Sequence, residues 1–190
     1  MSDADTPTTV VPARSSGIAV LIAVALGALV AVGLGAFGKV HEPQYFSINL
    51  AGFSSGLVVK AWLATVAMVL ALFQLVSAFA MYRLIPGGKA PFWIGTAHVW
   101  SGRLAVLVSV PVAVHCLYAL GFQTADTRVL LHSFLGCFFY GIFICKMIVL
   151  AKDDQKPWVI PVIGGLVFTG LVGLWLTSSL WFFSNNGLHL

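Results

Sequence analysis

The sequence predicts an all-α integral membrane protein, a helical bundle with five transmembrane helices. Hydrophobic residues make up 59% of its 190 residues and charged residues only 8%, whereas a soluble globular domain has about 25% charged residues. The apolar residues also gather in five long runs, each near the ~20 residues that cross a ~30 Å hydrocarbon core as a helix. Helices are expected because an open strand would leave its backbone groups unpaired in lipid.

Short polar segments separate the five predicted helices and bound them at both ends. The predicted spans are 17–38, 58–82, 93–122, 129–151 and 158–183. Residues 1–16 are polar and rich in Thr and Pro, so a disordered N-terminal tail is expected before the transmembrane domain 17–183. Residues 184–190 are expected to form a short C-terminal tail. The apolar run after Arg14 is longer than the ~7–15 residues of a signal sequence core, which indicates a retained first helix.

The basic residues predict an orientation in the membrane. Ten Lys and Arg give a net charge of +4, but they form no run that could follow a phosphate backbone, so no nucleic-acid partner is expected. With the N-terminus inside, the cytoplasmic edges hold Arg14, Arg83, Lys89, Lys152 and Lys156, and the outer edges hold Lys39, Lys60 and Arg128. This bias predicts a multi-pass protein of a bacterial plasma membrane, with a cytoplasmic N-terminus and an outer C-terminus.

Small residues recur at every fourth position of the first predicted helix. They are Ala23, Gly27, Ala31 and Gly35. Such a stripe lets a second helix approach closely. We interpret it as ordinary packing within the bundle rather than as a dedicated dimer interface.

Two histidines in neighbouring spans are expected to lie at the same depth. His115 lies eight residues after the midpoint of the third predicted helix, and His132 lies eight residues before the midpoint of the fourth. A connection of about six residues favours antiparallel neighbours, which would bring both imidazoles near the outer face and toward each other. An ionisable side chain within a span indicates a functional site, because its insertion costs about 2.5–3.5 kcal/mol.

The residues around His132 predict a haem b site between the third and fourth helices. At helical spacing, Gly136, Phe139 and Lys146 follow His132 along one face. Gly136 leaves room for a flat macrocycle, and apolar walls would exclude water from a haem iron held by His115 and His132. The alternative is a histidine pair that only hydrogen-bonds between helices, a contact worth about 0.6 kcal/mol.

Three further residues could serve at the inner face. His98 lies seventeen residues before His115, a rise of ~25 Å, so the two cannot share one iron. His98 either ligates a second haem, with Met147 or Met81 as partner, or anchors the helix in the interface, which we favour. Arg103 and Lys146 either extend to the interface, the default for such side chains, or bind a quinone or lipid headgroup between them.

The segments HVWSGRLAVLVSVPVAVHCLYALGF (98–122) and LHSFLGCFFYGIFICK (131–146) resemble an uncharacterised family of small five-helix bacterial membrane proteins. Their H-x-W-x-G-R-L opening and paired helical histidines are more loosely similar to ferric-reductase-like and other b-type membrane cytochromes. That resemblance implies haem ligated by histidines from neighbouring helices, with His115 and His132 as the outer pair and His98 as the histidine that opens its helix. No flavin- or nicotinamide-binding domain is expected from the residues after these segments.

The function expected from the sequence is that of a b-type cytochrome-like electron-transfer subunit. Its partners would be the lipid bilayer and a redox protein or larger membrane complex. No substrate chemistry of its own is visible, since the sequence has no nucleophile motif such as G-x-S-x-G. The alternative is a non-catalytic membrane subunit or assembly factor of a respiratory or transport complex, without haem.

Overall fold

A computed structural model describes residues 16–47, 49–86, 89–152 and 155–190 of the chain. Within these residues the protein is helical, and five helices are long and apolar enough to cross a membrane, as predicted. The elements are α1 (Ser16–Val40), α2 (Gly56–Met81), α3 (Ile94–Val114), η1 (His115–Leu120), α4 (Thr127–Leu150), α5 (Val159–Trp175), η2 (Leu176–Leu180) and α6 (Trp181–Asn186). The predicted N-terminal tail lies outside the described residues except for Ser16, which begins α1.

The helices begin and end within a few residues of the predicted spans. Two of them change from α-helical to π-helical geometry near their ends. The third continues from α3 into the π-helical segment η1, and the fifth passes through a second π-helical segment, η2, into α6. α6 extends to Asn186, three residues beyond the predicted end of the fifth helix at 183. Gly187 ends this helix because its positive φ of 77° suits glycine.

Side chains cap the first turns of α2 and α4. The Ser55 hydroxyl accepts a hydrogen bond from the Val58 amide, and the Asp126 carboxylate accepts one of 2.8 Å from the Val129 amide. These caps satisfy backbone donors that a helix start leaves unpaired. Asp126 therefore fixes the point at which the chain re-enters the bundle after η1.

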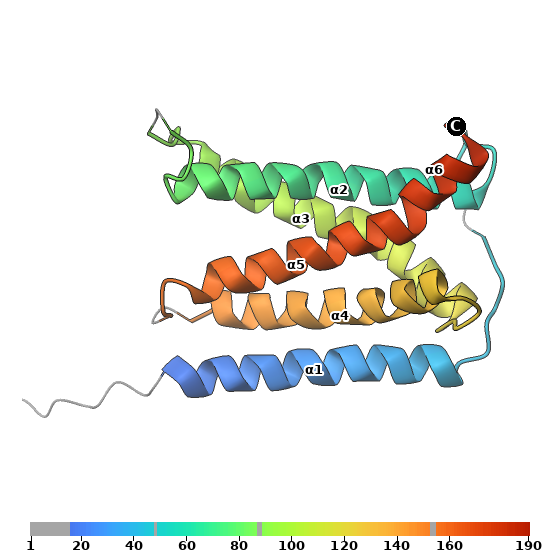
Figure 1. The fold of residues 1–190 in the computed structure, drawn as a ribbon, viewed down its shortest axis with the longest axis horizontal. Coiled ribbons are helices and arrows are strands. Elements are labelled where there is room, and N and C mark those ends of the chain that lie inside the picture. Colours follow the sequence, from blue (N-terminus) through green and yellow to red (C-terminus); the bar gives the residue numbers. More distant parts are fainter. Residues whose placement is uncertain (1–15, 48, 87–88, 153–154) are drawn as a thin grey trace, which may run out of the picture.

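The bundle is built from helix pairs that are not always neighbours in the sequence (Figure 1). α2 packs against α3, while α4 packs against α1 on one side and α5 on the other. α5 also contacts α2, which joins the two groups. α3 is not packed along α4, although a short loop connects them, so the tight neighbour relation expected from that loop is absent. The two helices meet instead at a hydrogen bond of 3.0 Å between the Ser109 and Tyr140 hydroxyls.

The α1–α4 contact is a close approach of two backbones. A Cβ built on Gly141 would lie 2.6 Å from the Gly27 carbonyl oxygen and 2.8 Å from the Ala31 Cβ. Ala23 is fully buried in the same interface, beside Cys145. The small-residue stripe of α1 therefore serves packing within the bundle, as the sequence favoured.

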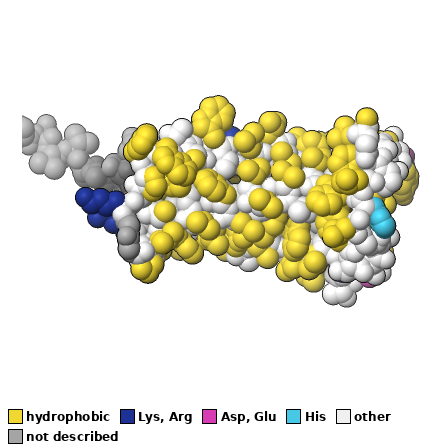
Figure 2. Space-filling model, turned by 90° about the horizontal axis from the view of Figure 1, so that it is seen from above, with side chains coloured by type: hydrophobic (Ala, Val, Ile, Leu, Met, Phe, Trp, Pro, Cys, Tyr) yellow, Lys and Arg dark blue, Asp and Glu magenta, His cyan; other side chains and the backbone are white. Residues whose placement is uncertain are grey.

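The outer surface of the bundle is apolar along its length. Figure 2 shows hydrophobic side chains spread over one long face, with Lys and Arg side chains gathered at one end and a histidine at the other. Large side chains such as Leu29, Val69 and Leu107 are each more than half exposed. A soluble monomer rarely exposes so continuous an apolar surface, which is the surface expected in contact with a lipid bilayer.

Candidate functional site

A cavity of about 630 Å³ opens among the helices where α1 ends and α4 begins. Its walls come from α1, α2, α3, η1, α4 and the segment from Thr177 to Phe182. Because α3 diverges from α4, their side chains leave this space unfilled. The volume lies within the ~300–1,000 Å³ typical of ligand sites. We call this space the membrane cavity.

The membrane cavity is long and unequal in polarity. Along α4 its lining extends from Arg128 to Ile144, sixteen residues that span ~24 Å at helical rise. Its polar lining residues lie mainly toward the Arg128 end, and they are Lys60, Gln123, Arg128, His132, Ser133, Thr177, Ser178 and Ser179. Farther along, Val30, Val110 and Ile144 provide apolar walls around Tyr140.

Both π-helical segments border the membrane cavity. η1 begins four residues after Pro111, whose missing N–H and ring disturb the regular hydrogen bonds of α3. The loop after α1 satisfies carbonyls of η1, because the Tyr45 amide donates to the Ala119 oxygen over 3.0 Å and the His41 ring approaches the Tyr118 oxygen at 3.2 Å. π-helical turns are rare and are found frequently at functional sites.

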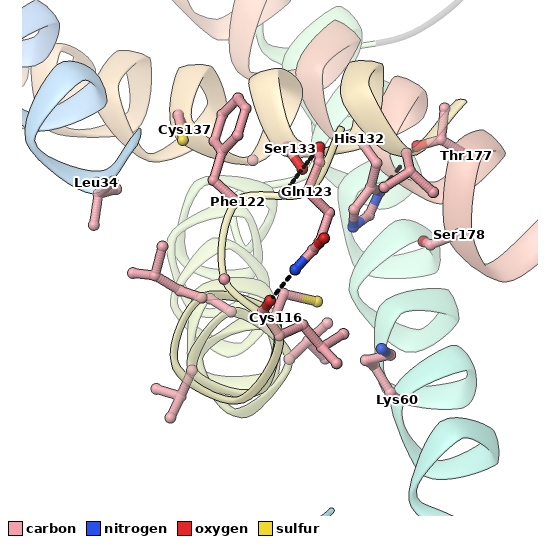
Figure 3. A pocket seen from close by; sticks show the side chains of 18 of the residues that line it. Leu34, Lys60, Cys116, Phe122, Gln123, His132, Ser133, Cys137, Thr177 and Ser178 are labelled. Atoms are coloured by element: carbon pink, nitrogen blue, oxygen red, sulfur yellow. Dashed lines mark hydrogen bonds between the residues drawn. The ribbon is translucent and has the colours of Figure 1, made fainter. Parts of the chain in front are cut away.

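His132 presents one ring nitrogen to the membrane cavity. Its Nδ1 lies 3.0 Å from the Thr177 hydroxyl, which itself donates to the Gly173 carbonyl oxygen over 2.7 Å. When the single proton of this hydroxyl points to the Gly173 oxygen, the hydroxyl accepts from His132, and Nδ1 carries the hydrogen. In the neutral ring, Nε2 then keeps its lone pair, and Figure 3 shows this nitrogen turned toward the space bordered by Cys116 and Lys60. A metal-binding histidine has the same arrangement, with one nitrogen held by an acceptor and the other free.

His115 lies near the same end of the bundle but is not among the residues that line the membrane cavity. It is buried, with 7% of its surface exposed, and its ring lies edge-on to Phe46 at a centroid distance of 6.2 Å. No hydrogen bond joins His115 to His132 among the described residues. Of the two predicted ligands, His132 therefore lines the cavity and His115 does not.

Gly136 and Phe139 have different roles on α4. Gly136 borders the membrane cavity one turn after His132, and a Cβ at this position would meet only Leu174, at 4.0 Å. Its lack of a side chain therefore contributes open space. Phe139 is buried against Ala71 and Leu171 in the core, where it also borders a smaller cavity of about 80 Å³ that shares His132 and Gly136 with the larger one.

Two cations face the membrane cavity, a feature that sequence reasoning missed because both were interpreted only as topology signals. Arg128 donates to the Thr177 carbonyl oxygen over 2.8 Å, lies 3.9 Å over the Trp181 ring and pairs with Asp126 at 3.9 Å. Lys60 has no hydrogen bond or ion pair among the described residues. No Asp or Glu is among the described lining residues.

A hydroxyl on the cavity wall also lacks a partner. Ser179, in η2, is fully buried, and its Oγ makes no hydrogen bond among the described residues. Its neighbours Thr177 and Ser178 instead donate to carbonyls of the preceding turn. Buried hydroxyls are nearly always paired, so Ser179 is an exception among the polar residues of this wall.

His98 at the opposite end is held in a polar network between α2 and α3. Its Nδ1 lies 2.7 Å from the hydroxyl of Ser77, which is fully buried and donates to the Gln74 carbonyl oxygen over 3.1 Å. The Gln74 amide donates to the Ser101 hydroxyl over 2.7 Å and to the His98 carbonyl oxygen. His98 therefore joins two helices through its hydrogen bonds, a more specific role than the expected interface anchor.

Arg103 and Lys146 differ in their surroundings. The Arg103 guanidinium lies 5.1 Å from the Trp100 ring centroid and is exposed, and Lys146 is partly buried on α4. A quinone or lipid headgroup between them stays a prediction. No group of three or more His, Cys, Asp and Glu suitable for a metal ion occurs within the described residues.

Comparison with known proteins identifies a family for nearly the whole chain. Residues 20–190 match the model of a family of unknown function, DUF6529, and the chain belongs to that family. This agrees with the expected small uncharacterised family. No curated protein and no solved structure gives a significant match.

Proposed function

We propose that this member of the DUF6529 family binds haem b in the membrane cavity and acts as an electron-transfer subunit, with His132 as an axial ligand. The observation that carries the proposal is the free Nε2 of His132, which faces the cavity while Nδ1 donates to Thr177. A bound haem would supply one-electron chemistry through its iron. The electrons would come from and go to a redox protein or a larger membrane complex.

The residues of the cavity fit this group. Thr177 would hold the His132 ring in one orientation and increase its basicity as a ligand. Gly136 leaves open space one turn away, and the apolar walls would exclude water. Lys60 and Arg128 provide positive charge on the cavity wall, where the carboxylates of a haem would need it.

The structure presents one histidine ready to bind, not two. His115 lies outside the lining, so ligation by both histidines would require η1 to turn this ring toward the cavity. We therefore expect His132 to be the principal protein ligand. The same observation favours the second candidate, a membrane subunit or assembly factor without haem, whose histidines only hydrogen-bond between helices.

An absorption spectrum of the purified protein distinguishes these two candidates. Cells well supplied with haem should yield protein whose reduced-minus-oxidised difference spectrum has sharp b-type bands. The spin state then reports the second axial position, since two histidines give a low-spin iron and one histidine gives a high-spin iron. Protein that carries no haem under these conditions would exclude the cytochrome assignment and leave the second candidate.

The charge bias further supports a proposed orientation, with the N-terminus in the cytoplasm of a bacterium and the cavity near the outer face of the plasma membrane. A reporter enzyme fused after Leu190 is expected to be active only outside, and one inserted after Pro86 only inside. Activity in the reverse pattern would place the cavity at the cytoplasmic face.

A further inference from the structure

We infer that the membrane cavity holds an anionic amphiphile, with its acid group at Lys60 and its apolar body along α4. The inference deepens the proposed function and rests on it only for the identity of the ligand as haem. Haem carries two carboxylates on an apolar macrocycle, and a membrane lipid carries a phosphate on apolar chains. Both share the chemistry that this cavity would recognise.

The charge of the cavity lining favours an anionic ligand. Two cations and no described acidic residue line a cavity whose remaining walls are largely apolar. Charge in such surroundings is poorly screened, so an anion is favoured and a cation is repelled. A neutral ligand would leave the charge of Lys60 without compensation, because Asp126 pairs only with Arg128.

The two cations differ in the partners that they already have. Arg128 is already engaged, because the Thr177 carbonyl, the Asp126 carboxylate and the Trp181 ring surround its guanidinium. Lys60 has no such partner among the described residues. It lies four residues into α2, ~6 Å from the helix start, and Figure 3 shows its side chain directed toward the space that His132 and Cys116 also border. Lys60 is therefore the cation that can still pair with an anionic group of a ligand.

The polar groups of the membrane cavity are unevenly distributed along it. They lie mainly toward one end of a space that follows α4 for ~24 Å. His132, Ser133 and Thr177 belong to that same polar region, close to Arg128 along the chain or in contact with it. A ligand with one charged end and a long apolar body matches this arrangement.

The test compares haem b with its dimethyl ester, in which both carboxylates are blocked. The full-length protein, purified in detergent and freed of haem, is titrated with each porphyrin and followed by absorbance. We expect about tenfold tighter binding of haem than of the ester, a preference that Lys60→Met abolishes while the iron spectrum stays unchanged. Lys39→Met, at an exposed residue that does not line the cavity, should keep the preference.

The possible outcomes separate the inference from the proposed function. Haem that binds without preference over the ester, or with a preference that Lys60→Met retains, overturns the inference and leaves the haem assignment intact. If neither porphyrin binds, the haem assignment fails. Lipid exchange with vesicles of phosphatidylglycerol or phosphatidylcholine then tests whether the cavity holds an anionic lipid. Retention of phosphatidylglycerol over phosphatidylcholine that is lost in Lys60→Met supports the inference, and equal retention of the two lipids overturns it.

Discussion

Replacement of His132 by Ala is expected to remove most of the bound haem. The change deletes the only imidazole that lines the membrane cavity among the described residues, and with it the proposed bond to haem iron. The ratio of haem to purified protein, measured from the reduced-minus-oxidised spectrum, checks this result. The free energy of unfolding should change much less, because the ring makes a single side-chain hydrogen bond, worth about 1 kcal/mol.

Variants at neighbouring positions test whether that loss is specific. Ser133→Ala changes another lining residue of α4 and should retain haem. Lys146→Ala lies fourteen residues farther along the helix, ~21 Å from His132, and should also retain it. His98→Ala should leave the haem-to-protein ratio unchanged while weakening the α2–α3 contact through Ser77. Loss of half the haem in His98→Ala would instead indicate a second haem.

Thr177 and His115 separate the positioning role from direct ligation. Thr177→Val removes the acceptor of His132 Nδ1, and loss of such a partner typically weakens metal affinity by about 10–100-fold. His115→Ala should reduce haem content far less than His132→Ala, because its ring does not line the cavity. Equal losses in the two histidine variants would show that both bind iron and that η1 rearranges to allow it.

The membrane fold could be predicted because its causes are local. A run of about twenty apolar residues must be helical in lipid, whatever else the chain contains. The role of the α1 stripe was accessible for the same reason, since residues four apart lie on one face of a helix.

The mutual positions of the histidines depended on information that is not local. The sequence argument assumed that a short loop brings the third and fourth helices together along their length. In the structure α4 packs instead against α1 and α5, and Gly27 and Gly141 let the backbones of α1 and α4 approach closely. The side chains that face the resulting gap could not be identified from helical spacing in either helix alone.

The π-helical geometry of η1 also changes which residues share a face. A π turn contains more residues than an α turn. Faces assigned with 3.6 residues per turn are therefore wrong within η1, which follows α3. His115 is the first residue of η1. Lys60 was missed for a different reason, because a basic residue near a helix end serves the positive-inside rule and a binding site equally well.

Gly141→Leu is expected to cause a large loss of stability. Even a Cβ at this position would lie 2.6 Å from the Gly27 carbonyl oxygen, a backbone atom that cannot move aside without shifting α1. Overpacking of this kind costs about 1–3 kcal/mol or more. Thermal unfolding of the detergent-purified protein, followed by circular dichroism, should show a clearly lower midpoint for this variant.

Gly33→Leu provides the matched control on α1, because a Cβ there meets nothing within 4 Å and the position is exposed. Its unfolding midpoint should stay unchanged or rise slightly, since leucine favours a helix over glycine by up to about 1 kcal/mol. Equal midpoints for Gly141→Leu and Gly33→Leu would contradict the close approach of α1 and α4. Because α4 also carries His132, separation of these helices should weaken ligand binding in Gly141→Leu, whereas Gly33→Leu should bind as the unaltered protein does.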